Sequence, residues 1–378
     1  MLPFVRLRRL TINTLILLAV VLIFGSFLLS LILTAIVRKL AVRSGFVAHP
    51  APDRYHQTVI PLGGGIAIFT SIAVILVAAA LAVRFLLVPG RFSSLVQSAN
   101  IDPADFMGKI TELLVILLVA FGLFILGLVD DKKHLNPFLK LAVQFIVAFI
   151  AAFFADVRVE LFIENRIITS LISTFWIVLI VNTFNFLDNM DGASAGIAVI
   201  AASILFTAAA ISTQVYIGGL ALVFIGTLLG FLAFNFPPAK IFMGDAGSLV
   251  VGFFLALLTL RTTYYHEALS KQWHTVLMPL IVMAVPLYDF ASVTLLRISQ
   301  GKSPFVGDTQ HFSHRLKRHG LNDTQTVLTL YLATLATGLS ATFLYQVNLP
   351  GAILIFVQTI MVLAIIAIFE STVKNQKS

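Results

Sequence analysis

The sequence predicts an all-α membrane protein, a bundle of helices that crosses a lipid bilayer many times. Of its 378 residues, 59% are hydrophobic and only 11% are charged, and the mean hydropathy is +1.01. A soluble globular domain has about 45–50% apolar residues, so this composition excludes that class. The apolar runs are continuous rather than alternating, which argues against a membrane β-barrel. We expect a single integral membrane domain over residues 1–378.

About eleven apolar runs are long enough to cross a hydrocarbon core, which takes about 20 helical residues. The first run follows the basic segment MLPFVRLRR and lacks a small-residue cleavage pattern, so we expect a span rather than a cleaved signal. Several runs are closely spaced or short, notably 246–262, which leaves ten spans as the alternative. In chain order the predicted spans are 13–37, 63–88, 111–129, 138–155, 167–187, 193–213, 217–235, 246–262, 275–296, 325–345 and 350–370.

Lysine and arginine set the expected orientation, because they concentrate in cytoplasmic loops. The loops after the odd-numbered spans carry most of them, whereas Arg6, Arg8 and Arg9 at the N-terminus oppose this arrangement. We expect the loops to outweigh the N-terminus, which places the N-terminus outside and these loops in the cytoplasm. The chain has no cysteine, so disulfides and thiolate metal sites are excluded.

Polar side chains concentrate in the loops of that one face, whereas the opposite loops hold scattered charges without a pattern. Such a one-sided cluster is what a site supplied from the cytoplasm needs. The five signature loops cover residues 45–65, 128–140, 182–196, 234–248 and 297–320.

Asp130 and Asp131 are adjacent carboxylates at the end of a predicted span. An interfacial anchor is one interpretation, in which Lys132 and Lys133 neutralise the pair. Two like charges near a low-dielectric boundary are unfavourable unless they share a cation. A hard divalent cation would satisfy both carboxylates, so the anchor and the cation site both remain open.

The stretch NTFNFLDNMDG places several polar residues at the end of an apolar helix. Capping explains one or two of them. Helical spacing aligns Asn182 and Asn185 with Asp188 or Asn189, and Asp191 continues that face. A polar stripe on the last turns of a span must face protein or water. We therefore predict a polar wall for a charged ligand.

In FMGDAGS, Asp245 lies between Gly244 and Gly247, immediately before the next apolar run. One interpretation is a helix cap formed by Asp245 or Ser248. The other is a metal site, because the glycines permit close backbone approach and a carboxylate beside phosphate is a natural Mg²⁺ ligand.

The segment HFSHRLKRHG places His311, His314 and Arg315 on one helical face. A zinc site is disfavoured, because no third ligand has a usual spacing. A basic cluster that hydrogen-bonds phosphate oxygens fits better. The alternative is a positively charged cytoplasmic loop in which the histidines are incidental.

These segments resemble one family, the polyprenyl-phosphate N-acetylhexosamine-1-phosphate transferases. LVDDKKHLNP, NTFNFLDNMDG, FNFPPAKIFMGDAGS and GKSPFVGDTQHFSHRL match its four signature loops in order, and RYHQTVIPLGGG matches a fifth. The resemblance covers residues 45–320. FNFPPAKIFMGDAGS and GKSPF look like the undecaprenyl-phosphate GlcNAc-1-phosphate transferases. The phospho-MurNAc-pentapeptide transferases of peptidoglycan synthesis, the alternative, usually have a denser histidine run.

The chain departs from the family pattern at three places. Ser313 stands where the family commonly has a histidine of H-x-H-H, and Asn189 and Met190 stand inside the usual D-G-L-D-G. Asp53 replaces a more usual basic residue. These departures leave the reaction class intact and the identity of the sugar open.

The resemblance implies a reaction in which a lipid phosphate attacks the sugar-bearing phosphorus of a UDP-sugar and UMP leaves. The lipid-linked diphosphate sugar that forms would begin a cell-envelope glycan. The implied cofactor is Mg²⁺, with Mn²⁺ as the alternative ion. The implied partners are undecaprenyl phosphate, a UDP-sugar and membrane lipids, with no nucleic acid, and a homodimer is left open. The expected location is the bacterial inner membrane, with the active site on the cytoplasmic face.

The resemblance also implies residue roles. Asp245 would hold the metal, and Asp130 would orient or deprotonate the lipid phosphate with support from Asp131. We favour a direct displacement over a phospho-enzyme, because the second pKa of a phosphomonoester is about 6 and the acceptor is already largely ionised. The predicted catalytic residues are Asp130, Asp131, Asp188 and Asp191, and the predicted substrate-binding residues are Asn182, Asn185, His56, His311, His314 and Arg315.

An ion-coupled transporter is the main alternative from another functional class. It predicts acidic residues near mid-span, paired half-helices and an internal repeat. Here the acids lie at the ends of spans on one side, and the sequence has no repeat. The transferase is therefore the preferred prediction.

Overall fold

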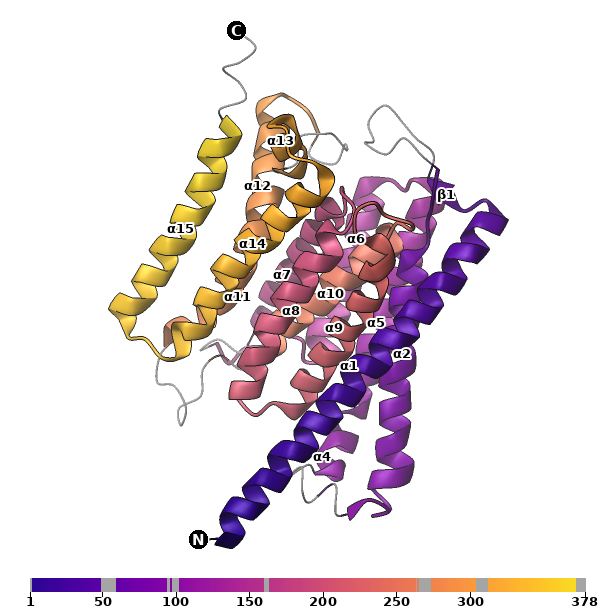
Figure 1. Cartoon of the computed structure of the whole chain (residues 1–378), viewed down its shortest axis with the longest axis vertical. Coiled ribbons are helices and arrows are strands. Elements are labelled where there is room, and N and C mark those ends of the chain that lie inside the picture. The colour runs from indigo at the N-terminus through magenta and orange to yellow at the C-terminus, as the bar shows by residue number, and fades with distance from the viewer. Residues whose placement is uncertain are drawn as a thin grey trace.

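The chain is almost entirely helical, which confirms the all-α prediction (Figure 1). Within the described residues, the exception is a ribbon of two short antiparallel strands, β1 (Val47–Ala48) and β2 (Ile60–Pro61). The computed structural model describes residues 2–48, 59–93, 96, 102–159, 163–262, 264, 273–303 and 312–371.

Long helices form the body of the molecule, and short segments extend or connect them. The long helices are α1 (Leu2–Ser44), α2 (Gly64–Ala82), α5 (Ile110–Lys133), α6 (Pro137–Phe154), α7 (Arg166–Leu187), α8 (Ala193–Ile211), α9 (Val215–Asn235), α10 (Asp245–Arg261), α12 (Ala284–Ser299), α14 (Asp323–Thr342) and α15 (Leu349–Ser371). The short ones are η1 (Val83–Leu87), α4 (Pro103–Gly108), η2 (Trp273–Leu277), α11 (Met278–Val282), α13 (Phe312–Arg318) and η3 (Phe343–Tyr345).

The predicted number of about eleven spans is not confirmed. Among the described residues, nine helices are long and apolar enough to cross a membrane, or ten if the bent pair Trp273–Val282 and Ala284–Ser299 counts as one span. The pair is bent by 60°. The remaining predicted span corresponds to α10, which has only 17 residues. Each predicted run is helical, so the difference lies in length and bending rather than in secondary structure.

Polar caps explain where several helices begin. Asn136 accepts a hydrogen bond from the Phe138 N–H, and Pro137 occupies the first turn of α6, where its missing N–H has no effect. Asn165 caps α7 through the N–H groups of Ile167 and Ile168. These caps satisfy donors that have no partner inside the helix.

The short helix α10 forms the centre of the bundle. It packs against α2, α5, α7, α8 and α9, and its residues from Ala246 to Thr259 are buried. Glycines bring the neighbouring backbones close to it, because a Cβ atom at Gly65 or Gly127 would collide with backbone atoms of Gly247 or Asp245. Since protein rather than lipid surrounds α10, a helix shorter than a full span can be accommodated there.

The two ends of the bundle can be followed in Figure 1. The chain's N-terminal end and α4 lie at one end, whereas β1 and α13 lie at the other. The C-terminal helices α14 and α15 stand at one side, where α14 contacts α8, α11 and α12. The described parts of the predicted signature loops belong to the end that carries β1 and α13.

Candidate active site

Hydrogen bonds draw the signature loops together at one end of the bundle. The Phe242 N–H donates to the Pro61 carbonyl at 2.9 Å, and the Gly64 N–H donates back to the Phe242 carbonyl at 2.9 Å. The Gly192 N–H donates to Asn235 Oδ1 at 3.1 Å. These bonds hold the first, third and fourth loops against one another, so residues far apart in the sequence share one surface.

A lysine lies at the centre of the acidic cluster. Lys140, in the first turns of α6, places its ammonium group 2.7 Å from Asp130 Oδ2 and also forms an ion pair with Asp245. The same ammonium donates a hydrogen bond of 3.3 Å to Asn185 Oδ1. The Lys140 and Asp130 side chains are only 14% and 12% exposed, so this pairing is shielded from solvent. One cation therefore joins residues of α5, α6, α7 and α10.

Asn185 completes this connection. Its side-chain amide donates hydrogen bonds of 2.9 Å to Asp245 Oδ1 and of 2.9 Å to Ser248 Oγ. The amide thus holds the Asp245 carboxylate in a fixed orientation at the start of α10. The sequence predicted Asn185 as a substrate-binding residue, and the structure brings it to the acidic cluster.

Asp131 caps the central helix from outside it. Its Oδ1 accepts a hydrogen bond of 2.8 Å from the Asp245 N–H, and its Oδ2 accepts one of 3.1 Å from the Ala246 N–H. Gly244 has a φ of +70°, and a Cβ atom there would lie 2.7 Å from Asp131 Oδ2. The capping interpretation of Asp245 and Ser248 is therefore wrong, because a carboxylate of α5 performs this task and leaves Asp245 for other contacts.

The interfacial anchor predicted as one alternative for the acidic pair does not form as described. Asp130 pairs with Lys140 and accepts a hydrogen bond of 2.7 Å from the Leu135 N–H. Lys132 lies instead over the ring of Phe46, 5.5 Å from its centroid. The neutralising cation thus comes from the next helix, not from the neighbouring lysines.

Asp188 lies at the end of α7 and faces other carboxylates. Dense protein around the carboxyl group raises its pKa well above 3.8, although part of the side chain remains exposed, and the nearby carboxylates of Asp245, Asp131 and Asp191 raise it further. A hydrogen bond with the Gly244 backbone opposes this shift. Asp191 Oδ2 accepts a hydrogen bond of 2.8 Å from the Ala239 N–H. Four predicted aspartates and Asp245 therefore belong to one electrostatic cluster.

Not every predicted residue joins this cluster. The Asn182 amide donates hydrogen bonds of 2.7 Å to Gln144 Oε1 and of 2.8 Å to the Val178 carbonyl, which links α7 to α6 inside the bundle. Arg315, on α13, donates a hydrogen bond of 2.7 Å to Ser292 Oγ of α12. Each of these contacts positions a helix.

Three predicted histidines cannot be placed. His56 and His311 lie outside the described residues, as does Asp53. His314 belongs to α13, but its side chain is outside the described part of the chain. Their proposed contacts with phosphate therefore remain predictions.

Two departures from the family pattern contact each other. Ser313 Oγ donates a hydrogen bond of 2.6 Å to Asn189 Oδ1, and the Asn189 amide donates one of 2.7 Å to the Phe186 carbonyl. Ser313 is 3% exposed. These bonds join the fifth signature loop to the third beside the aspartate cluster.

Sequence reasoning missed the role of Lys140, which it counted only among the basic residues of a loop. A signal was present, because Lys140 follows Pro137 in the first turn of a helix. The helix dipole disfavours a cation at that position. A lysine there indicates a nearby anion, here the carboxylates of Asp130 and Asp245.

The donor atoms of the cluster fit a hard divalent cation in kind, since carboxylate and amide oxygens are the ligands that Mg²⁺ prefers. Within the described residues, no group of three or more acidic, histidine or cysteine side chains is already arranged to hold a metal ion. The Lys140 ammonium lies between Asp130 and Asp245 instead. Burial is the larger cause of the raised pKa of Asp188, but Asp245, Asp131 and Asp191 also lie close enough to raise it, so a cation bound here would face several carboxylates.

The chain matches known proteins over this site. Residues 113–263 match the model of glycosyl transferase family 4. This chain is 31% identical over 349 residues to a probable undecaprenyl-phosphate N-acetylglucosaminyl 1-phosphate transferase of Bacillus subtilis. The alignment covers 90% of this chain and 89% of that relative. This chain is also 28% identical to a decaprenyl-phosphate N-acetylglucosaminephosphotransferase of Mycolicibacterium smegmatis, in an alignment that covers 88% of this chain and 83% of that relative.

A third relative, the undecaprenyl-phosphate alpha-N-acetylglucosaminyl 1-phosphate transferase of Salmonella typhi, is 25% identical over 86% of this chain and 83% of its own length. The matched segment includes the aspartates of the cluster and the whole of α10. The alignments extend well beyond that segment, over most of the membrane bundle. This chain therefore belongs to glycosyl transferase family 4.

Proposed function

We propose that the protein transfers N-acetylglucosamine 1-phosphate from UDP-N-acetylglucosamine to a polyprenyl phosphate in the membrane. An oxygen of the lipid phosphate attacks the phosphorus that bears the sugar, and the bond from that phosphorus to the oxygen bridging to UMP breaks. UMP leaves with the bridging oxygen, and the product is a polyprenyl diphosphate sugar. The observation that carries the proposal is the aspartate cluster around Lys140, in a chain whose relatives are named for this transfer.

The cluster suits a reaction that brings several phosphate groups together. Asp245, with Asp188 beside it, would hold Mg²⁺, or Mn²⁺ as the alternative ion, and the bound ion would supply positive charge against the phosphates. Lys140 contributes a fixed cation on the same surface. Asn185 orients Asp245 through its hydrogen bond, and Asp131 fixes the helix that carries it.

Asp130 is the proposed partner of the acceptor phosphate. Its carboxylate accepts a hydrogen bond from the Leu135 N–H and pairs with Lys140, so its position is fixed. An acceptor phosphate is largely ionised near neutral pH and needs orientation more than deprotonation. The ionised acceptor can attack the phosphorus itself, and this favours direct displacement over a phospho-enzyme.

The choice of sugar rests on the relatives. The three described above are named for N-acetylglucosamine phosphate, which favours this donor over UDP-MurNAc-pentapeptide. The site lies at one end of the membrane helices, beside basic residues such as Lys132 and Lys140. This supports a multi-pass protein of the bacterial inner membrane whose active site faces the cytoplasm, where UDP-sugars are made.

A direct test is to incubate the purified protein with undecaprenyl phosphate, Mg²⁺ and one UDP-sugar at a time, and to identify the lipid product by mass. UDP-N-acetylglucosamine should give a lipid heavier by one N-acetylglucosamine phosphate. UDP-N-acetylgalactosamine and UDP-MurNAc-pentapeptide should give much less product. A lipid product from UDP-MurNAc-pentapeptide alone would overturn the choice of sugar, and no lipid product from a folded protein would overturn the reaction.

A further inference from the structure

A cavity lies at the end of the bundle opposite to the aspartate cluster. Its volume is about 930 Å³. Arg261, which lines it, ends α10, whereas Asp245 begins that helix. The 17 residues of α10 rise about 25 Å, so the cavity is separate from the proposed active site. Lys109, just before α5, also lines it at that end of the bundle, and Trp176, near the middle of α7, marks how far the cavity extends between the helices.

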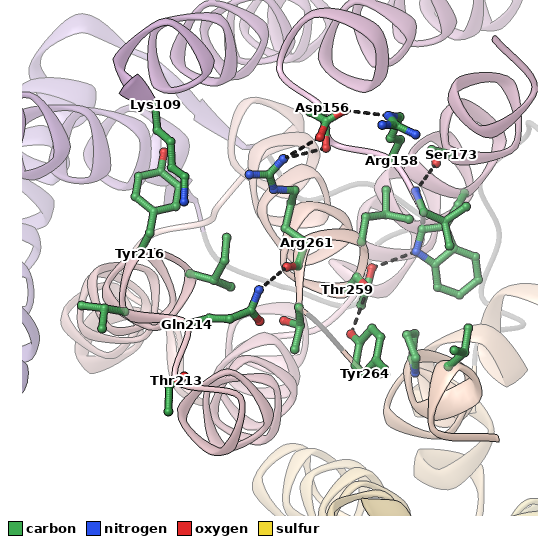
Figure 2. Close-up of a pocket in the computed structure, with 18 of the residues that line it drawn as sticks. Lys109, Asp156, Arg158, Ser173, Thr213, Gln214, Tyr216, Thr259, Arg261 and Tyr264 are labelled. Carbon is green, nitrogen blue, oxygen red and sulfur yellow. Dashed lines mark hydrogen bonds and ion pairs between the residues drawn. The ribbon is translucent and has the colours of Figure 1, made fainter. Parts of the chain in front are cut away.

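Charged side chains of both signs line this cavity (Figure 2). Arg261 donates a hydrogen bond of 2.9 Å to Glu112 and one of 3.4 Å to Asp156 Oδ2. Arg158 donates one of 2.6 Å to Asp156 Oδ1. Among the described lining residues, the acidic and basic side chains are equal in number, namely Asp102, Asp105 and Asp156 against Lys109, Arg158 and Arg261.

Two polar groups of the cavity wall are poorly satisfied by the protein. The Lys109 ammonium lies 3.7 Å from Asp105, too far for a good hydrogen bond, and 5.8 Å from the centroid of the Tyr216 ring. Within the described part of the chain, the buried Tyr216 hydroxyl has no hydrogen-bond partner. Such groups favour a ligand that supplies both an acceptor and a donor.

The rim of the cavity reaches the lipid-facing surface. Ile172, Val215 and Leu280 line the cavity and are 41%, 42% and 45% exposed. Ile172 lies inside α7, a helix that is long and apolar enough to cross the membrane, so its exposed face is expected to meet lipid. An occupant can therefore enter sideways from the bilayer, with its apolar part remaining among the lipid tails.

We propose that this cavity binds a zwitterionic phospholipid headgroup, phosphoethanolamine, from the leaflet opposite to the aspartate site. The phosphate would accept a hydrogen bond from Lys109, and one from the buried Tyr216 hydroxyl once that side chain turns toward the cavity, while the primary ammonium would donate to Asp102 or Asp105. An anionic lipid fits less well, because the basic side chains are matched by acidic ones. A soluble ligand would leave the apolar rim without a function. The site is independent of the sugar-phosphate transfer.

Trp176 provides a reporter inside the cavity. The chain has two tryptophans, and Trp273 is 55% exposed and does not line the cavity. Trp273→Phe in the full-length protein leaves Trp176 as the only tryptophan. This protein is placed in phosphatidylcholine nanodiscs, and its fluorescence is measured as brominated-acyl phosphatidylethanolamine or phosphatidylglycerol replaces the host lipid.

Phosphatidylethanolamine should quench Trp176 with saturation, at about a tenfold lower mole fraction than phosphatidylglycerol, a ratio that corresponds to about 1.4 kcal/mol. Lys109→Gln and Tyr216→Phe, made separately in this background, should each reduce the difference between the two lipids. Lys39→Gln, an exposed lysine of α1 outside the cavity, is the matched control and should keep it. Circular dichroism and the elution volume identify folded variants.

Equal, non-saturating quenching by all the lipids would show contact with bulk lipid only and would overturn the proposal. A preference for phosphatidylglycerol would overturn the zwitterionic assignment. Unchanged selectivity in both folded variants would also contradict it, since the two groups assigned to the phosphate would then contribute nothing. None of these results depends on transferase activity, so the proposed function stands or fails separately.

Discussion

Lys140 determines the charge balance of the candidate active site. Its ammonium lies between the Asp130 and Asp245 carboxylates, which come from helices far apart in the sequence. Both partners are largely buried, so removal of the lysine would leave two carboxylates facing each other in a poorly solvated place. A buried charge that loses its partner destabilises a protein by about 3–5 kcal/mol.

Lys140→Met tests this role. In EDTA we expect the free energy of unfolding to fall by about 3 kcal/mol, the low end of the range for a buried charge that loses its partner, because the Asp130 and Asp245 side chains keep some contact with solvent. Added Mg²⁺ should restore part of the melting temperature, since a divalent cation can neutralise the same carboxylates. Lys240→Met, a lysine of the fourth loop with no ion pair among the described contacts, is the control. An unchanged melting temperature in Lys140→Met would contradict the central position of this lysine.

Asp245→Asn separates the charge of Asp245 from its size. The cap of α10 comes from Asp131, so the variant should fold normally. UMP release should fall on the order of 100-fold, the effect typical of losing one electrostatic group of an active site. More Mg²⁺ should rescue the activity poorly, because a hard cation prefers an anionic oxygen. An active, folded variant with the metal dependence of the wild type would remove Asp245 from the metal site.

The carboxylates around Asp188 predict an effect of pH on stability without metal. Folding raises the pKa of Asp188 above 3.8. At pH values above 3.8, the folded state therefore binds more protons than the unfolded state. This contribution to stability is therefore present at low pH and is lost as the pH rises through the raised pKa. Asp188→Asn should melt higher than the wild type at pH 8 in EDTA, and the difference should shrink at pH 4. Parallel melting curves across this range would contradict the prediction.

At the scale of elements, the sequence predicted the positions of the helices well, whereas its count of about eleven membrane spans is not confirmed. Long apolar runs such as that of α9 are distinct whatever surrounds them. Whether α10 crosses depends on its neighbours, because protein covers it on all sides. The break between α11 and α12 had a local signal, since Pro286 lacks the N–H that would bond to Val282.

The bond between Asn189 and Ser313 joins the third loop to α13, and no propensity predicts it. We expect Asn189→Ala and Ser313→Ala each to lower the thermal stability, with the double variant less destabilised than the sum. A coupling of about 1 kcal/mol is typical of one hydrogen bond between neutral groups. Ser292→Ala combined with Asn189→Ala is the matched control, because Ser292 bonds Arg315 instead. Additive effects for Asn189 and Ser313 would show that the bond does not hold the two loops together.

For the molecule as a whole, the sequence predicted that the signature loops share one face, because Asp130, Asn185 and Asp245 all lie at the matching ends of alternate spans. The structure adds which residues meet. Lys140 reaches Asp245 only because α6 packs beside α7 and glycines bring α10 close to α5. Such contacts depend on how the helices pack in three dimensions, which hydrophobic periodicity does not specify. No sequence motif indicated the cavity at the opposite end of the bundle.

The central claim is that a phosphorus atom moves with the sugar. UDP-N-acetylglucosamine labelled with ³²P in the phosphate next to the sugar tests it directly, with undecaprenyl phosphate as the acceptor and Mg²⁺ present. We predict that the label enters the lipid fraction together with N-acetylglucosamine and that the released nucleotide is unlabelled UMP. Release of labelled UDP, with the sugar alone on the lipid, would contradict the account.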